Sequence, residues 1–129
     1  MQEALSGISS SRFWSAVDRL VATSRPVIDR PKGSAHPKIV EAVYPIDYGY
    51  LEGTTAGDGA GIDVWIGSMR PAVVTGVVCT IDSNKRDAEI KFLLGCTPDE
   101  AIEIVTFLNK GSMAAVLILR PESAAPGRR

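Results

Sequence analysis

This chain of 129 residues has little cysteine and histidine, no excess of either charge and no long hydrophobic run. Its two cysteines, Cys79 and Cys96, stand outside any Cys-x-x-Cys or metal-ligand spacing, which is typical of small buried apolar residues in a reducing compartment. The 14 Lys and Arg against 15 Asp and Glu give a net charge of −1, whereas a protein that neutralises many nucleic-acid phosphates needs a surplus of cations.

Two further absences concern membranes. No stretch approaches the ~18 to 20 apolar residues that cross a bilayer. The first residues of the chain also lack the basic region and the apolar region that a signal peptide combines. We therefore expect a cytoplasmic protein with neither nucleic acid nor a membrane as its partner.

The composition that is present is that of one globular domain. Hydrophobic residues make up 45% of the chain and charged residues 22%, so the chain is able to build its own core without disulfides or metals. We expect a single domain over residues 1–129, with flexible segments at residues 1–10 and in the polar tail 122–129.

Two helices are predicted, one toward each end of the chain. Serines at positions 9 to 11 are candidate caps, and Phe13, Trp14, Val17 and Leu20 follow at helical spacing up to about Thr23. This apolar stripe is either core packing or an oligomer contact. The second helix begins at Thr97-Pro98-Asp99-Glu100, a capping-box pattern, and is closed by Lys110-Gly111.

Between and beyond the helices, β-branched and apolar runs predict five strands. Two of these runs, Val73–Ile81 and Ala88–Leu94, are joined by a polar turn and form an antiparallel hairpin. The others are Val27–Arg30, Asp63–Ile66 and Met113–Leu119, while 43–58 has the composition of a functional loop. The expected fold is α+β, with a small closed or half-closed sheet.

Four aspartates stand out by their placement. Asp58 and Asp63 flank a Gly-Ala-Gly turn, and Asp82 and Asp87 lie at the two ends of the predicted hairpin turn. If the two loops meet, the four carboxylates converge and need a cation among them, for which oxygen ligands favour Mg²⁺, Mn²⁺ or Ca²⁺. The alternative is that each aspartate only caps its own turn, a common use of Asp beside Gly and Ser.

Cationic and hydroxyl groups elsewhere in the chain suit the oxygens of a phosphate. Carboxylate-held metals, lysines and tyrosines together are typical of a phosphoryl-transfer site. The candidates are Lys32, Lys38, Tyr44, Tyr48, Lys85, Arg86 and Lys91. Each of them also has an ordinary structural interpretation, as a solvated charge or as an aromatic ring at the edge of the core.

Residues 44–50 (YPIDYGY), then Thr54-Thr55, then 58–64 (DGAGIDV), resemble the soluble family I inorganic pyrophosphatases. That family has the pattern Tyr-Pro-x-(Asn/Asp)-Tyr-Gly-(Phe/Tyr), then Thr, then Asp-Gly-Asp-Pro-x-Asp-(Val/Leu). The pair Asp82 and Asp87 resembles the second acidic loop of the family. The resemblance covers about residues 27–95, and it implies a five-stranded OB-like barrel with flanking helices, an N-terminal and a C-terminal one.

The resemblance also implies a set of metal ligands. Asp58, Asp63 and Asp87 match the ligands of the tightest metal ion, and Asp82 with Asp87 matches the ligands of the ions that arrive with substrate. Asp29 lies where the family has a metal-associated Glu. The implied cofactor is Mg²⁺, with Mn²⁺ as a substitute, and the implied assembly is a homo-oligomer.

For the substrate, Lys38, Tyr44 and Tyr48 match positions of the family's phosphate-binding side chains and tyrosine motif. The implied catalytic residues are Asp58, Asp63 and Tyr48. Four departures weaken the pattern. Ala60 replaces the Asp that activates the attacking water, the segment with a phosphate-binding Arg is missing, and no Tyr-Lys pair follows near the C-terminus. Glu89 also replaces a Lys, for which Lys91 on the same strand face is the expected substitute.

Two functions follow from this pattern. The first is Mg²⁺-dependent hydrolysis of pyrophosphate by a metal-activated water, slowed because Ala60 is no base. The alternative is a non-catalytic relative that binds metal and a phosphate-bearing ligand, as a sensor or partner subunit. A third function, nucleic-acid binding through an OB-like barrel, is disfavoured by the near-neutral charge.

Overall fold

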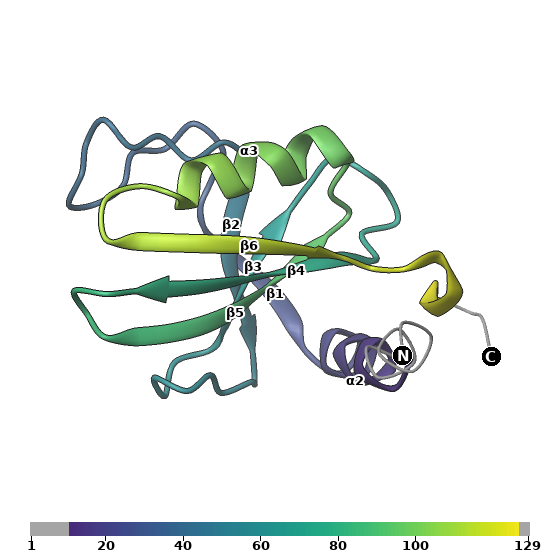
Figure 1. Cartoon of the computed structure of the whole chain (residues 1–129). Helices are drawn as coiled ribbons and strands as arrows, with labels where there is room; N and C mark the ends of the chain where they lie inside the picture. Colours follow the sequence, from purple (N-terminus) through teal and green to yellow (C-terminus); the bar gives the residue numbers. More distant parts are fainter. Residues whose placement is uncertain (1–10, 127–129) are drawn as a thin grey trace, which may run out of the picture.

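The structure, a computed structural model, describes residues 11–126 and consists of two α-helices, six strands and one short 3-10 helix (Figure 1). The first helix is α2 (Ser11–Ala22), and the second is α3 (Pro98–Leu108). The strands are β1 (Arg25–Arg30), β2 (Asp47–Glu52), β3 (Ile62–Ile66), β4 (Val74–Asp82), β5 (Asp87–Leu94) and β6 (Met113–Leu119), followed by η1 (Glu122–Ala124). Within residues 11–126, no helix is long and apolar enough to cross a membrane.

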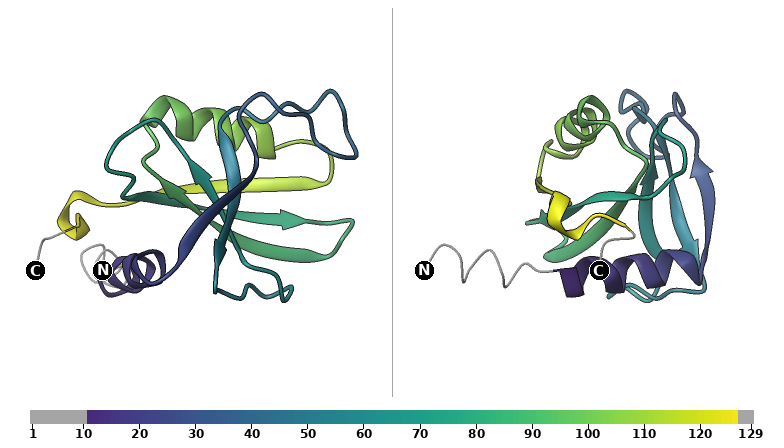
Figure 2. Two further views of the ribbon diagram at one scale, coloured as in Figure 1. Left: turned by 180° about the vertical axis from the view of Figure 1, so that it is seen from behind. Right: turned by 90° about the vertical axis from the view of Figure 1, so that its right-hand side faces the viewer.

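All six strands form one mixed sheet in the order β1-β2-β3-β5-β4-β6. Every pair is antiparallel except β3 and β5, which run parallel. Figure 2 shows a strongly curved sheet whose β1 end and β6 end lie on opposite sides of the molecule. The α+β class is confirmed, but the sheet has six strands instead of the predicted five, and no pairing between β1 and β6 closes it into a barrel within the described chain.

The sixth strand is β2, which lies in the segment 43–58 that we predicted to be a loop. It pairs with β1 on one side and with β3 on the other, so ladder hydrogen bonds from both neighbours stabilise it. Gly49 is required here because a Cβ at this position would collide with the carbonyl of Val27 on β1. A segment rich in aromatics and glycine therefore forms an inner strand of the sheet. Its pairing with the two neighbouring strands outweighs its weak local preference for strand structure.

The two helices cover opposite parts of the sheet, each over its own apolar cluster. Trp14 and Val17 of α2 pack with Leu51, Val64 and Phe92. On the other side α3 packs Ile104 and Leu108 against Trp65, Val78 and Leu93. The predicted first helix is confirmed, and Trp14 in it belongs to the core while Phe13 remains 43% exposed.

The predicted hairpin and the predicted cap are also confirmed. β4 and β5 pair over their whole length, with Asp82 opposite Asp87. α3 begins with the full capping box, in which Thr97 and Glu100 each accept the other's backbone N–H. In the tail expected to be flexible, residues 122–124 form η1 and Ala124 is buried, whereas residues 1–10 and 127–129 lie outside the described residues.

Candidate functional site

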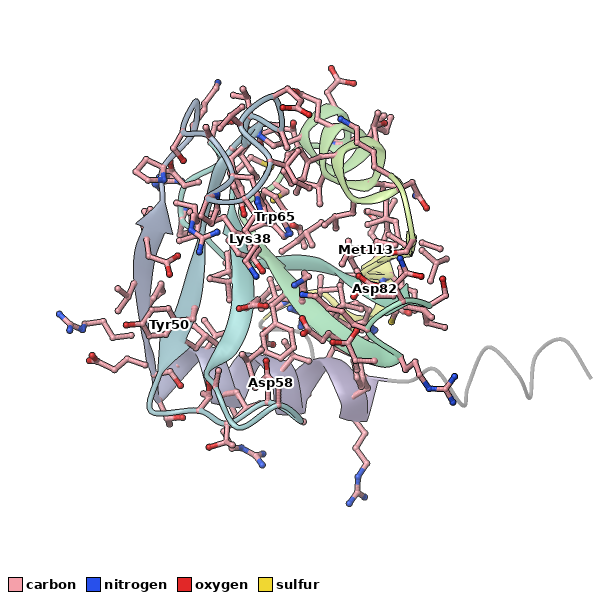
Figure 3. The ribbon with its side chains drawn as sticks, turned by 90° about the vertical axis from the view of Figure 1, so that its left-hand side faces the viewer. Lys38, Tyr50, Asp58, Trp65, Asp82 and Met113 are labelled. Atoms are coloured by element: carbon pink, nitrogen blue, oxygen red, sulfur yellow. The ribbon has the colours of Figure 1, made fainter. Side chains whose placement is uncertain are left out.

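A cavity of about 800 Å³ opens on the α3 side of the curved sheet. It is bordered by β1, the loop 31–44, β2, β3, β5 and the turn that leads from α3 into β6. Of the candidate residues named from the sequence, Asp58, Lys32 and Arg86 do not line this cavity, whereas the others do, namely Asp29, Lys38, Tyr44, Tyr48, Asp63, Asp82, Lys85, Asp87 and Lys91. Figure 3 shows Lys38, Trp65 and Asp82 around this region and Asp58 apart from it, beside α2.

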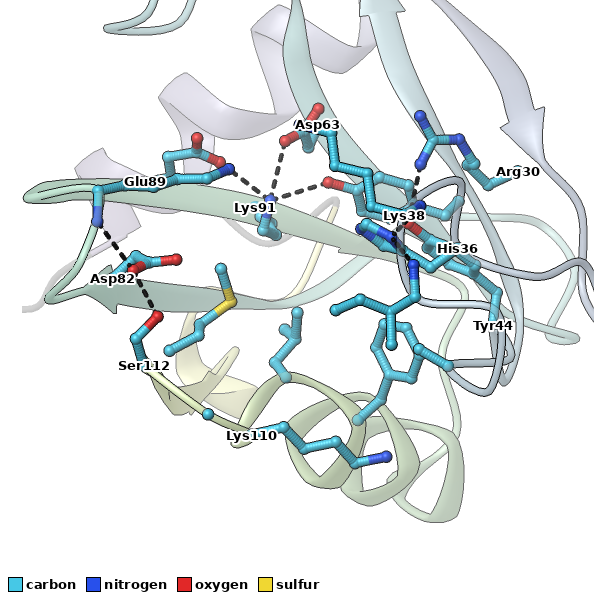
Figure 4. Close-up of a pocket in the computed structure, with 18 of the residues that line it drawn as sticks. Arg30, His36, Lys38, Tyr44, Asp63, Asp82, Glu89, Lys91, Lys110 and Ser112 are labelled. Carbon is cyan, nitrogen blue, oxygen red and sulfur yellow. Dashed lines mark hydrogen bonds and ion pairs between the residues drawn. The ribbon is translucent and has the colours of Figure 1, made fainter.

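At the centre of the cavity wall, the ammonium of Lys91 is enclosed by three oxygen acceptors. Lys91 Nζ lies 2.9 Å from Asp63 Oδ2, 3.0 Å from Glu89 Oε1 and 2.8 Å from the Tyr48 hydroxyl. Figure 4 shows the interactions of Asp63 and Glu89 converging on Lys91. The Lys91 side chain is only 6% exposed, so the ammonium is held in the protein by its partners and not by water.

The environment keeps both central groups protonated. Burial by itself lowers the pKa of the Lys91 ammonium, but its contacts with Tyr48 and Asp63 more than offset this and raise that pKa above its ordinary value. Burial raises the pKa of the Tyr48 hydroxyl, against the opposing effect of Lys91. At neutral pH Lys91 is therefore an ammonium and Tyr48 a neutral phenol.

A second group of charges lies at the end of the cavity formed by β1 and the loop 31–44. A register shift near the end of β1 lets the adjacent residues Asp29 and Arg30 both border the cavity. Arg30 donates to the Tyr44 hydroxyl at 3.0 Å and so has a fixed position. Lys38 from the loop and Lys85 from the β4–β5 turn border the same cavity. Three cations from separate segments therefore border this one cavity.

His36 stands among these cations. Its loop is held as a small ladder, in which the backbone N–H of His36 donates to Ala42 and that of Tyr44 donates to Ser34. The ring nitrogen Nδ1 accepts the backbone N–H groups of Lys38 at 3.0 Å and Ile39 at 3.3 Å, so the ring proton is on Nε2. Burial, and then the positive charges of Arg30, Lys38 and Lys85, lower the pKa of His36 below 6.5. His36 is therefore a neutral N–H donor on the cavity wall.

One member of each predicted aspartate pair, Asp58 in the first and Asp82 in the second, caps its own turn. Asp58 accepts the backbone N–H of Ala60 at 3.0 Å, which is a local turn, and it does not border the cavity. Asp82 borders the cavity but accepts from the backbones of Asn84 and Lys85 and from the Ser112 hydroxyl. For Asp58 and Asp82 the turn-capping alternative therefore applies, and because Asp58 lies outside the cavity that Asp63, Asp82 and Asp87 border, the four carboxylates do not all meet there.

These positions decide whether the residues fit a resident metal ion. Within residues 11–126, no group of three or more His, Cys, Asp and Glu side chains is close enough together to hold one. The carboxylates of Asp63 and Glu89 do face a cation, but that cation is Lys91. The arrangement therefore does not fit the metal centre that the resemblance implied, because an ammonium stands among the carboxylates.

An aromatic cluster forms the floor of the site. The ring of Trp65 lies 4.5 Å from that of Tyr48 and 5.8 Å from those of Tyr44 and Phe107. Trp65 is fully buried, and its indole N–H has no acceptor within residues 11–126. Trp65, Phe107 and Ser112 were not among the residues selected from the sequence, because Trp65 fits an ordinary strand position and no local pattern shows that Phe107 and Ser112, at the end of α3 and the turn after it, approach the acidic loops.

Comparison with solved structures identifies the architecture. An inorganic pyrophosphatase of Helicobacter pylori superposes with a TM-score of 0.54 over 81% of this chain and 88% of that one, at 16% identity. The fold is pyrophosphatase-like. An inorganic pyrophosphatase of Coxiella burnetii gives a TM-score of 0.51 over 77% of this chain and 86% of that one, also at 16% identity. No protein-family model and no curated protein matches the sequence.

The pyrophosphatase-like fold explains why motifs distant in sequence border one cavity. The segment 44–50 enters β2, 58–64 enters β3, and the second acidic loop joins β4 to β5. The structural similarity to family I inorganic pyrophosphatases agrees with the resemblance found in the sequence, at an identity low enough that only the fold carries over. The chemistry of this pyrophosphatase-like chain must be argued from its own side chains.

Proposed function

We propose that this pyrophosphatase-like chain binds pyrophosphate or a related phosphate-bearing small molecule in the cavity described above. The observation that carries the proposal is that Arg30, Lys38 and Lys85, from three separate segments, line the same cavity as His36. Three cations and a neutral N–H donor, brought from β1, the loop 31–44 and the β4–β5 turn, match the charge and the hydrogen-bond acceptors of phosphate oxygens. This is the alternative function of the sequence analysis, without a resident metal centre.

Tyr44 supports the groups that we expect to contact the ligand. Its hydroxyl holds Arg30 from one side, and its ring stacks on His36 with a centroid distance of 6.2 Å. Tyr44 thereby positions two of the groups that face the ligand. Tyr48 and Lys91 have a different role from Tyr44. Lys91 contacts Tyr48 and Asp63, and these residues lie at the end of the cavity where the carboxylates are. A ligand with a phosphate at one end and a hydroxyl or amine at the other would use both ends.

Calorimetric titration of the full chain with pyrophosphate tests this proposal. The wild type should bind one equivalent, and Lys38→Ala should weaken binding about tenfold because one charge-assisted contact is lost. Lys32→Ala is the matched control, since it removes the same charge from the same loop at a residue that does not border the cavity. Absence of binding to the wild type, or equal weakening by both variants, would contradict the proposal.

A second candidate function is Mg²⁺-dependent hydrolysis of pyrophosphate. The observation that favours it is that Asp29, Asp63, Asp82 and Asp87 border one cavity in a pyrophosphatase-like fold. Release of phosphate from pyrophosphate with Mg²⁺ or Mn²⁺, abolished in Asp87→Asn, would support it, and no release with either ion would exclude it. The rate should be lower by about 10²- to 10⁴-fold than with a general base, because Ala60 provides none. Assembly into a homo-oligomer stays a prediction.

A further inference from the structure

Lys91 stands where two carboxylates of the cavity face each other. We propose that its ammonium takes the place of a divalent cation between Asp63 and Glu89, so that the cavity binds its phosphate-bearing ligand without a metal ion at this position. The first part of this inference, called the cation half, is that Lys91 replaces a divalent ion, and it is independent of any ligand. The second part, called the ligand half, is that the phosphate-bearing ligand binds without a metal ion at this position, and it rests on the proposed function.

The geometry is that of a built-in cation. Lys91 and Glu89 project from the same face of β5, two residues apart, and Asp63 reaches them from the neighbouring parallel strand β3. An ammonium has three N–H donors, and these match the three acceptors on Asp63, Glu89 and Tyr48. The Lys91 side chain is 6% exposed, against 31% for that of Asp63 and 27% for that of Glu89, so Lys91 is the most buried of these three charged residues.

Electrostatics make the ammonium and a metal ion mutually exclusive at this place. Two carboxylates that share one position repel unless a cation lies between them, and Lys91 supplies that positive charge permanently. A divalent ion bound to the same oxygens would stand at contact distance from the ammonium, in a poorly hydrated environment where like charges repel strongly. Divalent binding at Asp63 and Glu89 therefore requires that the Lys91 side chain leave.

The same arrangement tells how the ligand is bound. All three donors of Lys91 are engaged inside the protein, so Lys91 neutralises the acidic wall but has no N–H left for a phosphate oxygen. Contact with phosphate then falls to the cationic end of the cavity, at Arg30 and Lys38. The sequence-based expectation that Lys91 replaces a phosphate-binding Lys is thus revised, because Lys91 acts on the carboxylates.

Manganese binding to the full chain, followed by electron paramagnetic resonance of free Mn²⁺, tests the cation half. Lys91→Met has a buried side chain of similar volume but no charge. We expect this variant to have a Mn²⁺ site at Asp63 and Glu89 whose affinity is at least about tenfold higher than that of the wild type at the same position. The double variant Lys91→Met/Glu89→Gln should lose that site. Lys85→Met is the matched control, because it removes the same charge from the cavity and leaves Lys91 in place. An equal gain in Lys85→Met, or none in folded Lys91→Met, would overturn the inference.

The wild type offers a test that does not depend on whether Lys91→Met folds. The chain has two tryptophans, Trp65 beside Tyr48 and Trp14 in the separate core under α2. With equimolar Mn²⁺, a paramagnetic ion, neither indole N–H signal of the wild type should broaden selectively in ¹⁵N spectra. Selective broadening of the Trp65 signal that disappears in Asp63→Asn would place a metal at Asp63 and overturn the inference.

Pyrophosphate titration in the presence of EDTA tests the ligand half and separates it from the proposed function. Binding in EDTA with unchanged affinity after Mg²⁺ is added supports the inference. Binding that appears only with Mg²⁺ overturns the inference and leaves the proposed function intact. If pyrophosphate binds under neither condition, the proposed function and the ligand half both fail, while the Mn²⁺ experiments still decide the cation half.

Discussion

The ammonium of Lys91 lies 2.9 Å from the carboxylate of Asp63, across the parallel contact between β5 and β3. Because Val64 is opposite Phe92 in that pairing, the residues that precede them, Asp63 and Lys91, project from the same face of the sheet. This single strand register decides which cation the acidic motif meets. The sequence suggested that the acidic motif binds a metal ion. In the structure, Asp63 of this motif instead forms an ion pair with Lys91 of the same chain.

Replacement of Asp63 by Asn should lower the free energy of unfolding by about 1–3 kcal/mol, because the buried ammonium loses one of its two carboxylates. Asp58→Asn is the control, since Asp58 only caps an exposed turn, and a loss within about 0.5 kcal/mol is expected there. Urea denaturation at pH 7 measures both values. Equal losses in the two variants would show that Lys91 does not depend on Asp63.

The ring of His36 should titrate below 6.5 in the free protein and shift upward when pyrophosphate binds. Burial, together with the charges of Arg30, Lys38 and Lys85, disfavours the imidazolium, and a bound anion offsets those charges. Nuclear magnetic resonance of the single histidine, with and without saturating pyrophosphate, measures both pKa values. A His36 pKa that does not change on binding would place the anion elsewhere.

Glu100 should make stability depend on pH in the acid range. Burial opposes its ionisation, but the backbone N–H groups of Thr97 and Ser68 outweigh this and lower the pKa of Glu100 below its ordinary value of 4.5. A lowered pKa in the folded state means that the carboxylate stabilises the protein above about pH 4.5 and that this contribution is lost as the pH falls through the folded-state pKa.

We therefore expect Glu100→Ala to lower the free energy of unfolding by about 1–2 kcal/mol at pH 7 and by less at pH 3. Urea denaturation of both proteins at the two pH values measures the difference. Exposed Glu103 on the same helix is the control, and Glu103→Ala should change little at either pH. A difference for Glu100→Ala that grows toward acid would contradict the prediction.

Gly49→Ala should be among the most disruptive single-methyl changes in this chain. The added Cβ would collide with the backbone carbonyl of Val27, so β1 has to move away from β2, and a loss of about 3 kcal/mol is expected. The displaced strand carries Arg30, so pyrophosphate affinity should fall as well. Gly57→Ala is the matched control, because nothing lies near its Cβ position. Thermal and urea unfolding with pyrophosphate titration would reveal whether the two substitutions differ.

Local sequence information predicted the elements that depend on local interactions. The capping box at Thr97, the apolar stripe around Trp14 and the β-branched runs on either side of 82–87 correspond to α3, α2 and the β4–β5 hairpin. In each of these, the signal that marks the element (a cap, a helical stripe or two runs beside one turn) lies within a short stretch of sequence. The strand β2 was missed because its stability comes from pairing with β1 and β3 and not from its own composition.

In the candidate site, too, some features could be predicted from the sequence and others depended on the tertiary structure. The sequence by itself determined the residue types: the acidic loops, the tyrosine motif and the cations of the loop 31–44, and with them the resemblance to pyrophosphatases. Only the tertiary structure decided that Asp58 lies outside the cavity, that Arg30, Lys38 and Lys85 border it together with His36, and that Lys91 contacts Asp63. Strand register and chain crossing set these neighbours over separations of tens of residues, and no short sequence pattern encodes such distances.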